Sequence, residues 1–121
     1  MGAIPIGLGA RDTLRLEKGY LLSGQDFDGN QTTLETGYSW VIDWNHDFIG
    51  KEALMRFQEK SYPKLRGILI EDRGIVRPGN SVFNNGRKIS SLTSGSLSPS
   101  LRKGIGLAYL DLDIGTLITV E

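Results

Sequence analysis

The sequence predicts a mostly β protein of the α+β class, in which a helical N-terminal segment leads into a small antiparallel C-terminal β-barrel that lacks its final strand. Three observations support this fold. The apolar runs after residue 64 are short and of strand type, turn-forming glycines separate them, and both helix-like stretches lie before residue 62. The chain has 121 residues, 39% of them hydrophobic, which fits one compact domain, or one domain plus a short piece of a neighbouring one. We therefore expect two parts, 1–62 and 63–121.

The N-terminal part is predicted to contain two helices. The first covers Gly9 to Lys18. The second covers Lys51 to Lys60, which is free of Pro and Gly and has an apolar side at helical spacing, and Asp47 is its expected cap. Between the helices lie an irregular polar stretch, 23–33, and a strand-like segment from Tyr38 to Trp44.

The C-terminal part contains five short runs that are predicted strands: Leu65 to Ile70, Ser81 to Phe83, Ile89 to Thr93, Ile105 to Leu110 and Leu117 to Val120. Asn84-Asn85-Gly86 predicts a hairpin, because tight primed turns need the positive φ that Asn and Gly adopt readily. The last run has no return partner, and an unpaired edge is a liability. We therefore expect the natural protein to continue beyond Glu121, and a second copy of the chain is a candidate partner for this edge, as a homodimer.

Composition excludes several classes of function. The 14 Lys and Arg are balanced by 14 Asp and Glu, so no net field favours nucleic acid or a membrane surface. The absence of cysteine excludes disulfides, thiolate zinc sites and thiol nucleophiles. No apolar run approaches the ~20 residues of a membrane-spanning helix, and the first residues lack the basic start of a signal peptide. We expect a cytoplasmic protein with no nucleic-acid or membrane partner.

Two features suggest metal or catalytic chemistry, and neither meets the requirements. The stretch from Asp26 to Asn30 resembles a calcium loop, but Gln31 and Gly37 stand where the loop needs Gly and Glu. An acidic surface loop is the better interpretation. His46 is the only histidine and forms neither a catalytic triad nor a two-imidazole metal site within this chain, so we interpret it as a solvated loop residue. No metal site is predicted.

The first predicted helix has an unusual charge pattern. Arg11 and Arg15 lie one turn apart, and Asp12 and Glu17 are available to hold their guanidinium groups in fixed orientation. From the residues alone, a solvated helix with ordinary salt bridges is the better interpretation, because exposed pairs of this kind are common.

This helix opens a series of motifs. The stretch Gly7 to Glu17 is followed by Tyr20 and Gly24-Gln25-Asp26, and later by Gly37-Tyr38-Ser39-Trp40, Asp47 to Leu54, Asp72 to Gly79, Thr93 to Leu101 and Gly104 to Tyr109. In this order, over nearly all of 7–110, they resemble the C-terminal third of glycine cleavage T-proteins, the aminomethyltransferases. A related iron-sulfur assembly protein has Lys-Gly-Cys where this chain has Lys18-Gly19-Tyr20, and the missing cysteine argues against that relative.

The resemblance implies transfer of an aminomethyl group from lipoylated H-protein to tetrahydrofolate, giving methylene-tetrahydrofolate and ammonia. It places Arg11 in contact with the folate and Tyr20 facing the same pocket. Trp40 is a further candidate, although core packing is the better interpretation for it.

By the same resemblance, 1–62 is the tail end of the folate-binding domain and 63–121 is a truncated C-terminal barrel. The family's catalytic aspartate matches no position here, so we expect no catalytic residue in this chain and no activity from it alone. The alternative is a stand-alone, non-catalytic folate-binding or protein-docking module of the same superfamily.

Overall fold

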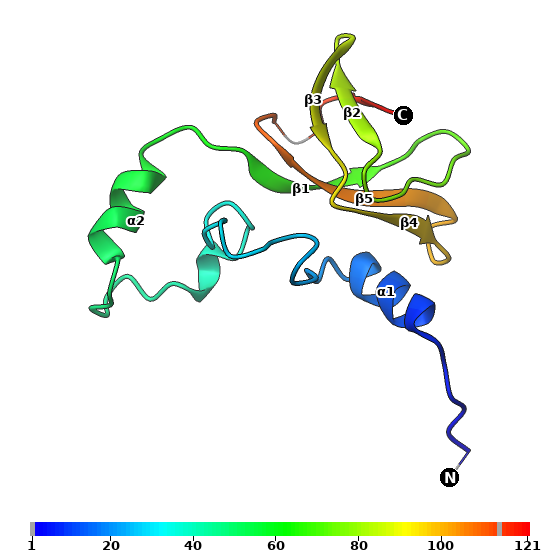
Figure 1. Ribbon diagram of the computed structural model, residues 1–121, viewed down its shortest axis with the longest axis horizontal. Helices are drawn as coiled ribbons and strands as arrows, with labels where there is room; N and C mark the ends of the chain where they lie inside the picture. Colours follow the sequence, from blue (N-terminus) through cyan, green and yellow to red (C-terminus); the bar gives the residue numbers. More distant parts are fainter. Residues whose placement is uncertain (1, 114) are drawn as a thin grey trace.

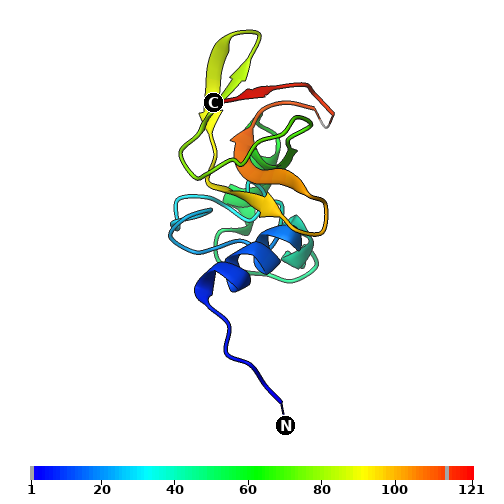
Figure 2. The same cartoon turned by 90° about the vertical axis from the view of Figure 1, so that its right-hand side faces the viewer.

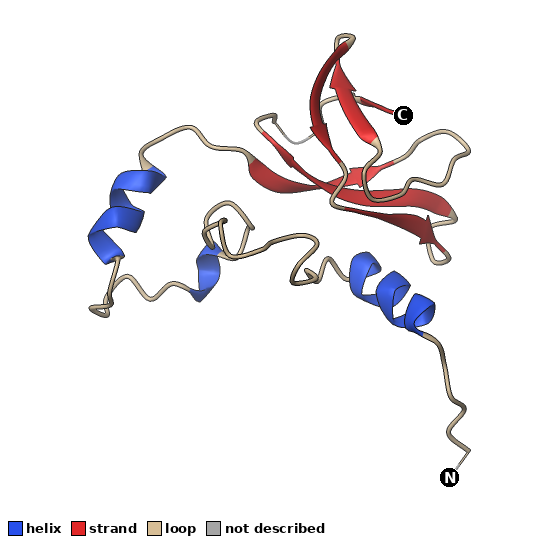
Figure 3. Ribbon diagram, viewed as in Figure 1, coloured by secondary structure: helices blue, strands red, loops and turns tan. Residues whose placement is uncertain are grey.

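The computed structural model describes residues 2–113 and 115–121. It contains helix α1 (Leu8–Glu17), a short 3-10 helix η1 (Ser39–Val41) and helix α2 (Lys51–Gln58) (Figures 1 and 3). The strands are β1 (Lys64–Leu69), β2 (Ser81–Asn84), β3 (Arg87–Ser91), β4 (Ser94–Ser98), β5 (Lys103–Leu110) and β6 (Thr119–Val120). The predicted α+β, mostly β fold class is confirmed.

The strands form two antiparallel three-stranded sheets with the orders β1-β5-β4 and β3-β2-β6. Within the described residues, no strand pairing joins the two sheets into a closed barrel. The sheet β1-β5-β4 lies between the hairpin β2-β3 on one side and α1 on the other (Figures 1 and 2). Neither helix in the described ranges is long and apolar enough to cross a membrane.

Strand β5 is central because both of its faces are covered. Ala108 and Leu110 point toward the second sheet, in a cluster with Ile68, Val76, Val82 and Leu92. Ile105 and Leu107 point toward α1 and pack with Leu16 of that helix. This alternation follows from the two-residue period of a strand, and it explains the almost unbroken burial of β5. One face of β5 thus supports the second sheet, and the other supports α1.

Both predicted helices are confirmed, with small shifts at their ends. α1 begins and ends one residue earlier than expected, and α2 ends at Gln58. The expected cap is wrong, because α2 is preceded by Gly50 at φ 91° with no side-chain cap, while Asp47 accepts a hydrogen bond from Lys51 Nζ at 3.3 Å. The strand expected from Tyr38 to Trp44 is also wrong. Ser39–Val41 of this segment forms η1, and among the described residues the segment pairs with no strand, so the apolar pattern alone did not specify its conformation.

The C-terminal strands largely follow the prediction. The hairpin between β2 and β3 is confirmed, and Asn85 and Gly86 have the positive φ values of 50° and 75° that a primed turn requires. The last run, however, does have a partner: β6 pairs with β2, and the backbones of Ser81 and Glu121 exchange hydrogen bonds of 2.6 and 2.9 Å. The expectation of an unpaired run is wrong, and the argument for a second copy of the chain there loses its premise.

Strand β4 was not predicted, because its serines and glycine look like turn residues. Its packing demands a small residue at Gly95, where an added Cβ would lie 2.9 Å from the carbonyl carbon and oxygen of Val76 and from the Arg77 nitrogen. These are backbone atoms, which cannot move aside like the end of a side chain. We expect Gly95→Ala to lower the unfolding free energy by about 1 to 3 kcal/mol, measured by urea denaturation.

The matched control for this substitution is Gly67→Ala in β1. Gly67 is also an extended strand glycine, but nothing lies within 4 Å of the position of its Cβ. Its unfolding free energy should stay within about 0.5 kcal/mol of wild type. Equal stability of the two variants would contradict the close packing of β4 on the segment before β2.

Candidate functional site

A buried ion pair lies where the last turn of α1 and the loop after it cover β4 and β5. Arg15 Nη1 donates to Asp26 Oδ2 at 2.6 Å, and Arg15 Nη2 donates to Ser94 Oγ at 2.9 Å. Nε of the same guanidinium donates to Asp12 Oδ1 at 2.7 Å. The side chains of Arg15 and Asp26 are 9% and 0% exposed. The interpretation of α1 as a solvated helix with ordinary salt bridges is therefore wrong for Arg15.

Asp26 accepts hydrogen bonds on both carboxylate oxygens. Thr93 Oγ1 and Ser94 Oγ each donate to Oδ1 at 2.6 Å, and the Leu22 N–H donates to Oδ2 at 2.9 Å. Burial raises the pKa of the carboxyl, but the hydrogen bonds from Ser94, Thr93 and Leu22, together with Arg15, outweigh it and leave the pKa of Asp26 below its ordinary value. The carboxylate therefore remains charged although it is buried. We call Arg15, Asp26, Thr93 and Ser94 the Arg15–Asp26 network.

A tight loop directs Asp26 inward. The Asp26 N–H donates to the Leu22 carbonyl at 2.8 Å, and the Gly24 N–H donates to the Phe27 carbonyl at 2.7 Å. Gly24 has φ 81°, a conformation that glycine adopts without strain. The loop turns back on itself, so the carboxylate faces β4. The interpretation of Asp26 to Asn30 as an acidic surface loop is thus wrong for Asp26.

Further side chains fasten the same loop to the sheet. Gln25 Nε2 donates to the Thr93 carbonyl at 3.0 Å and to Ser94 Oγ at 2.9 Å. The hydroxyl of Tyr109, on β5, donates to the Asp26 carbonyl at 2.8 Å. Burial, with the nearby charges of Glu35 and Asp26, raises the pKa of Tyr109 to about 12. Tyr109 therefore remains a neutral donor at physiological pH.

Glu17 forms a second connection between α1 and β4. Its carboxylate accepts from Ser98 Oγ, and from the N–H and hydroxyl of Ser100 at 3.0 Å each. These hydrogen bonds, that of Ser98 first, lower the pKa of Glu17. The sequence suggested that Asp12 and Glu17 hold the two arginines. Asp12 does hold Arg15, whereas Glu17 binds the end of β4 instead.

The network predicts acid sensitivity. Because the pKa of Asp26 is lower in the folded than in the unfolded chain, its contribution to stability is complete above the unfolded value of about 3.9 and is lost as pH falls through the folded one. We expect the melting temperature to drop as pH falls from about 5 to about 2, and to drop less in Asp26→Asn. Thermal unfolding by circular dichroism measures this, with Asp28→Asn, an exposed neighbour, as control. Equal drops in all three chains would contradict the depressed pKa of Asp26.

The three residues expected at a folate site are exposed. Arg11 lies on α1, one turn before Arg15, and the side chains of Tyr20 and Trp40 are 58% and 77% exposed. Core packing of Trp40 is therefore wrong, and its ring lies 6.0 Å from that of Tyr38. The hydrogen bonds and ring contacts of the described residues do not join the side chains of Arg11, Tyr20 and Trp40 to one another. Tyr20 is nevertheless tied to Arg15 through its backbone.

Two other predictions concern metals and His46. Across residues 2–113 and 115–121, no group of three or more His, Cys, Asp or Glu side chains is arranged to hold a metal ion. His46 is exposed and lies in a loop, as expected.

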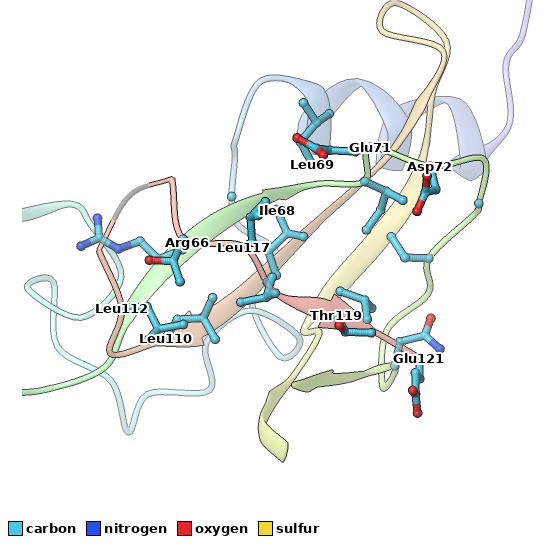
Figure 4. A pocket seen from close by; sticks show the side chains of 18 of the residues that line it. Arg66, Ile68, Leu69, Glu71, Asp72, Leu110, Leu112, Leu117, Thr119 and Glu121 are labelled. Carbon is cyan, nitrogen blue, oxygen red and sulfur yellow. The ribbon is translucent and has the colours of Figure 1, made fainter. Parts of the chain in front are cut away.

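A cavity of about 890 Å³ lies on the opposite face of the β1-β5-β4 sheet from α1. Figure 4 shows apolar side chains around it, among them Ile68, Leu110 and Leu117, with Arg66 on one side. Arg66 is half-buried, and its Nε atom has no hydrogen-bond partner among the described residues. The cavity is separated by the sheet from the Arg15–Asp26 network.

The comparisons with known proteins agree with the motifs. Residues 64–121 match the model of the glycine cleavage T-protein C-terminal barrel domain, and residues 1–46 match that of the GCVT N-terminal domain. The chain is 48% identical over 118 residues to the aminomethyltransferase of Halothermothrix orenii, covering 96% of this chain and 33% of that protein. It is 46% identical over 110 residues to the aminomethyltransferase of Thermotoga maritima, covering 91% and 30%.

A solved structure is also similar. The glycine cleavage system aminomethyltransferase T from Bartonella henselae matches with a TM-score of 0.86 and 30% sequence identity, over 96% of this chain and 35% of that one. Two small sheets with a motif-bearing helix on one face are thus the architecture of the C-terminal part of an aminomethyltransferase. The chain belongs to the glycine cleavage T-protein family, as the resemblance predicted. It spans about a third of the length of the relatives it matches.

Sequence reasoning did not identify the Arg15–Asp26 network. Asp26 and Ser94 both belong to motifs of the resemblance, but the sequence favours a surface loop for Asp26 and predicts no strand at Ser94. A signal was present for part of the network: Arg15 stands between Leu14 and Leu16, and Thr93-Ser94 directly follow Leu92 at the end of a predicted strand. Polar groups in such places need partners, so they indicate a buried hydrogen-bonded cluster.

Proposed function

We propose that this chain supplies part of the folate wall and the C-terminal covering sheets of an enzyme that transfers an aminomethyl group from lipoylated H-protein to tetrahydrofolate, giving methylene-tetrahydrofolate and ammonia. Membership of the T-protein family supports the reaction class. One observation carries the assignment of the wall: the buried Arg15 anchors the C-terminal end of α1, while Leu8, Arg11 and Leu14, which precede it in the helix, are exposed.

The exposed residues fit the chemistry of a folate. A guanidinium offers a planar fork of donors and stacks on flat rings, which suits the carbonyl, carboxylate and ring groups of the ligand. Tyr20 and Trp40 add aromatic faces. The role of these residues is to bind and orient the acceptor. We assign the carboxylate that supports the reacting nitrogen to a part of the enzyme outside this chain.

The proposal divides the chain at residue 62. Residues 1–62 contribute to the folate-binding domain, and 63–121 form the C-terminal domain. Separate family models for 1–46 and 64–121 support this division. The N-terminal part also exposes several large apolar side chains, which is typical of a surface that faces a ligand or a further domain: Ile4, Ile6, Leu8, Leu14, Trp40, Val41, Ile49 and Met55. A cytoplasmic location is part of the proposal and suits a chain without cysteine.

The chain alone is expected to have no aminomethyltransferase activity and to bind tetrahydrofolate weakly, because one wall cannot bury most of the ligand's surface. Release of ammonia from aminomethyl-lipoyl H-protein measures the activity, and calorimetric titration measures the binding, with the complete enzyme as the positive control. Turnover by the chain would contradict the assignment of the reacting carboxylate to another segment. Sub-micromolar binding without turnover would support a stand-alone folate-binding module instead.

A further inference from the structure

We propose that Arg15 and Asp26 are positioning residues for the folate site, which set the placement of Arg11 and Tyr20 relative to the C-terminal sheets. This inference rests on the proposed function, because it concerns the same folate wall. Its basis is the set of contacts made by one guanidinium group. Arg15 belongs to α1, Asp26 to the loop after α1, and Ser94, 79 residues further along the chain, begins β4.

The guanidinium of Arg15 leaves α1 little freedom to rotate. Its three nitrogens bind Asp12, Asp26 and Ser94 at 2.6 to 2.9 Å. Because the guanidinium is planar and its donors are fixed in direction, partners on three sides specify its orientation. The last turn of the helix is thereby held against the sheet.

Two of the three candidate folate residues, Arg11 and Tyr20, are attached to this anchor. Tyr20 donates its N–H to the Arg15 carbonyl at 2.8 Å, and its own carbonyl accepts from Arg15 Nη1 at 3.3 Å. Arg11 is four residues before Arg15 in the same helix, which places it roughly 6 Å along the helix axis. A rotation of α1 at its anchored end would move both residues, and a displacement of about 1 Å can cost about a hundredfold in rate.

A contribution to stability does not by itself explain why the Arg15–Asp26 ion pair is buried. Apolar side chains of similar volume in place of such a pair often leave stability unchanged or raise it. Apolar side chains, however, cannot donate to the Tyr20 carbonyl or to Ser94. Replacing both residues by apolar ones therefore separates a role in stability from a role in positioning. The replacement keeps the packing but removes the directional hydrogen bonds.

The test uses the complete enzyme carrying Arg15→Met together with Asp26→Leu. Steady-state kinetics with tetrahydrofolate and aminomethyl-lipoyl H-protein give KM for folate and kcat. We expect KM for tetrahydrofolate to rise about tenfold or more, while KM for the H-protein substrate stays unchanged. If Arg15 and Asp26 serve only the stability of the fold, the double substitution lowers only the fraction of enzyme that is folded and active. The apparent kcat then falls, and KM for folate stays at the wild-type value. An unchanged KM for folate therefore overturns the proposal.

Three further variants complete the design. Asp26→Asn keeps the size of the side chain and is assayed in the same way if the double variant fails to fold, with the same two outcomes for KM. Asp28→Asn, an exposed neighbour in the same loop, should leave KM unchanged. Arg11→Ala separates this inference from the proposed function. If Arg11→Ala raises KM for folate and the network variants do not, only the positioning role fails; if none of them raises it, the folate wall itself is wrong.

Discussion

Replacing Asp26 by alanine is expected to lower the unfolding free energy of the chain by about 3 to 5 kcal/mol. The substitution leaves the guanidinium of Arg15, only 9% exposed, without its main counter-charge. It also removes the acceptor of hydrogen bonds from Thr93, Ser94 and the Leu22 N–H. Asp12 still contacts Arg15, but it is 46% exposed and compensates only in part. Such a loss is a large share of the roughly 5 to 15 kcal/mol that typically separates folded from unfolded protein.

Chemical denaturation followed by circular dichroism measures this change. The matched control is Asp28→Ala, because Asp28 lies in the same loop and is exposed. It should change the unfolding free energy by no more than about 0.5 kcal/mol. If the two alanine variants unfold at the same denaturant concentration, the buried ion pair described here does not exist in solution.

The second large effect is expected at Arg11 in the complete enzyme. If its guanidinium is fixed against the folate, removing it costs roughly 1.5 to 3 kcal/mol, the range for a hydrogen bond to a charged group. Arg11→Ala should therefore weaken the use of tetrahydrofolate by about tenfold to a hundredfold. Arg11→Lys should recover only part of this loss, because lysine keeps the charge but lacks the planar fork. Steady-state kinetics at varied folate concentration provide the measurement.

Arg87→Ala is the control for this experiment. Arg87 is an exposed arginine at the start of β3. The β2-β3 hairpin lies on the other side of the β1-β5-β4 sheet from α1 (Figures 1 and 2). Arg87→Ala should alter folate use by less than about twofold. Kinetics of Arg11→Ala that match those of Arg87→Ala would mean that α1 has no part in folate binding.

Local signals predicted most of the fold. The apolar spacing of α1 and α2, and the Asn85-Gly86 turn, depend on residues close in the sequence, and all three are present in the structure. The errors concern long-range pairing. The segment from Tyr38 to Trp44 has strand-like residues but pairs with no strand in the part of the chain that the structure describes, whereas the Ser-rich β4 becomes a strand because β5 pairs with it. Composition does not show which segments meet, so it does not specify these two conformations.

The candidate site, like the fold, could be predicted from the sequence only in part. Arg11, Tyr20 and Trp40 came from the family motifs, and their roles remain proposals. Arg15 could not be separated from Arg11 by sequence, since the two are one turn apart on one helix. Only the structure shows that Arg15 is covered by Asp26 and Ser94, which lie 11 and 79 residues away. Burial of a charge depends on distant parts of the chain, so helical spacing alone indicates a shared face and not which member of the pair is buried.

The most direct test of the folate wall is a crystal structure of the complete enzyme with tetrahydrofolate bound. Our account predicts a nitrogen of the Arg11 guanidinium within about 3 Å of an oxygen or ring nitrogen of the folate. It also predicts that the Arg15–Asp26 network keeps the contacts described above. A folate bound elsewhere, with Arg11 facing solvent, would contradict the central claim that α1 of this chain forms part of the folate site.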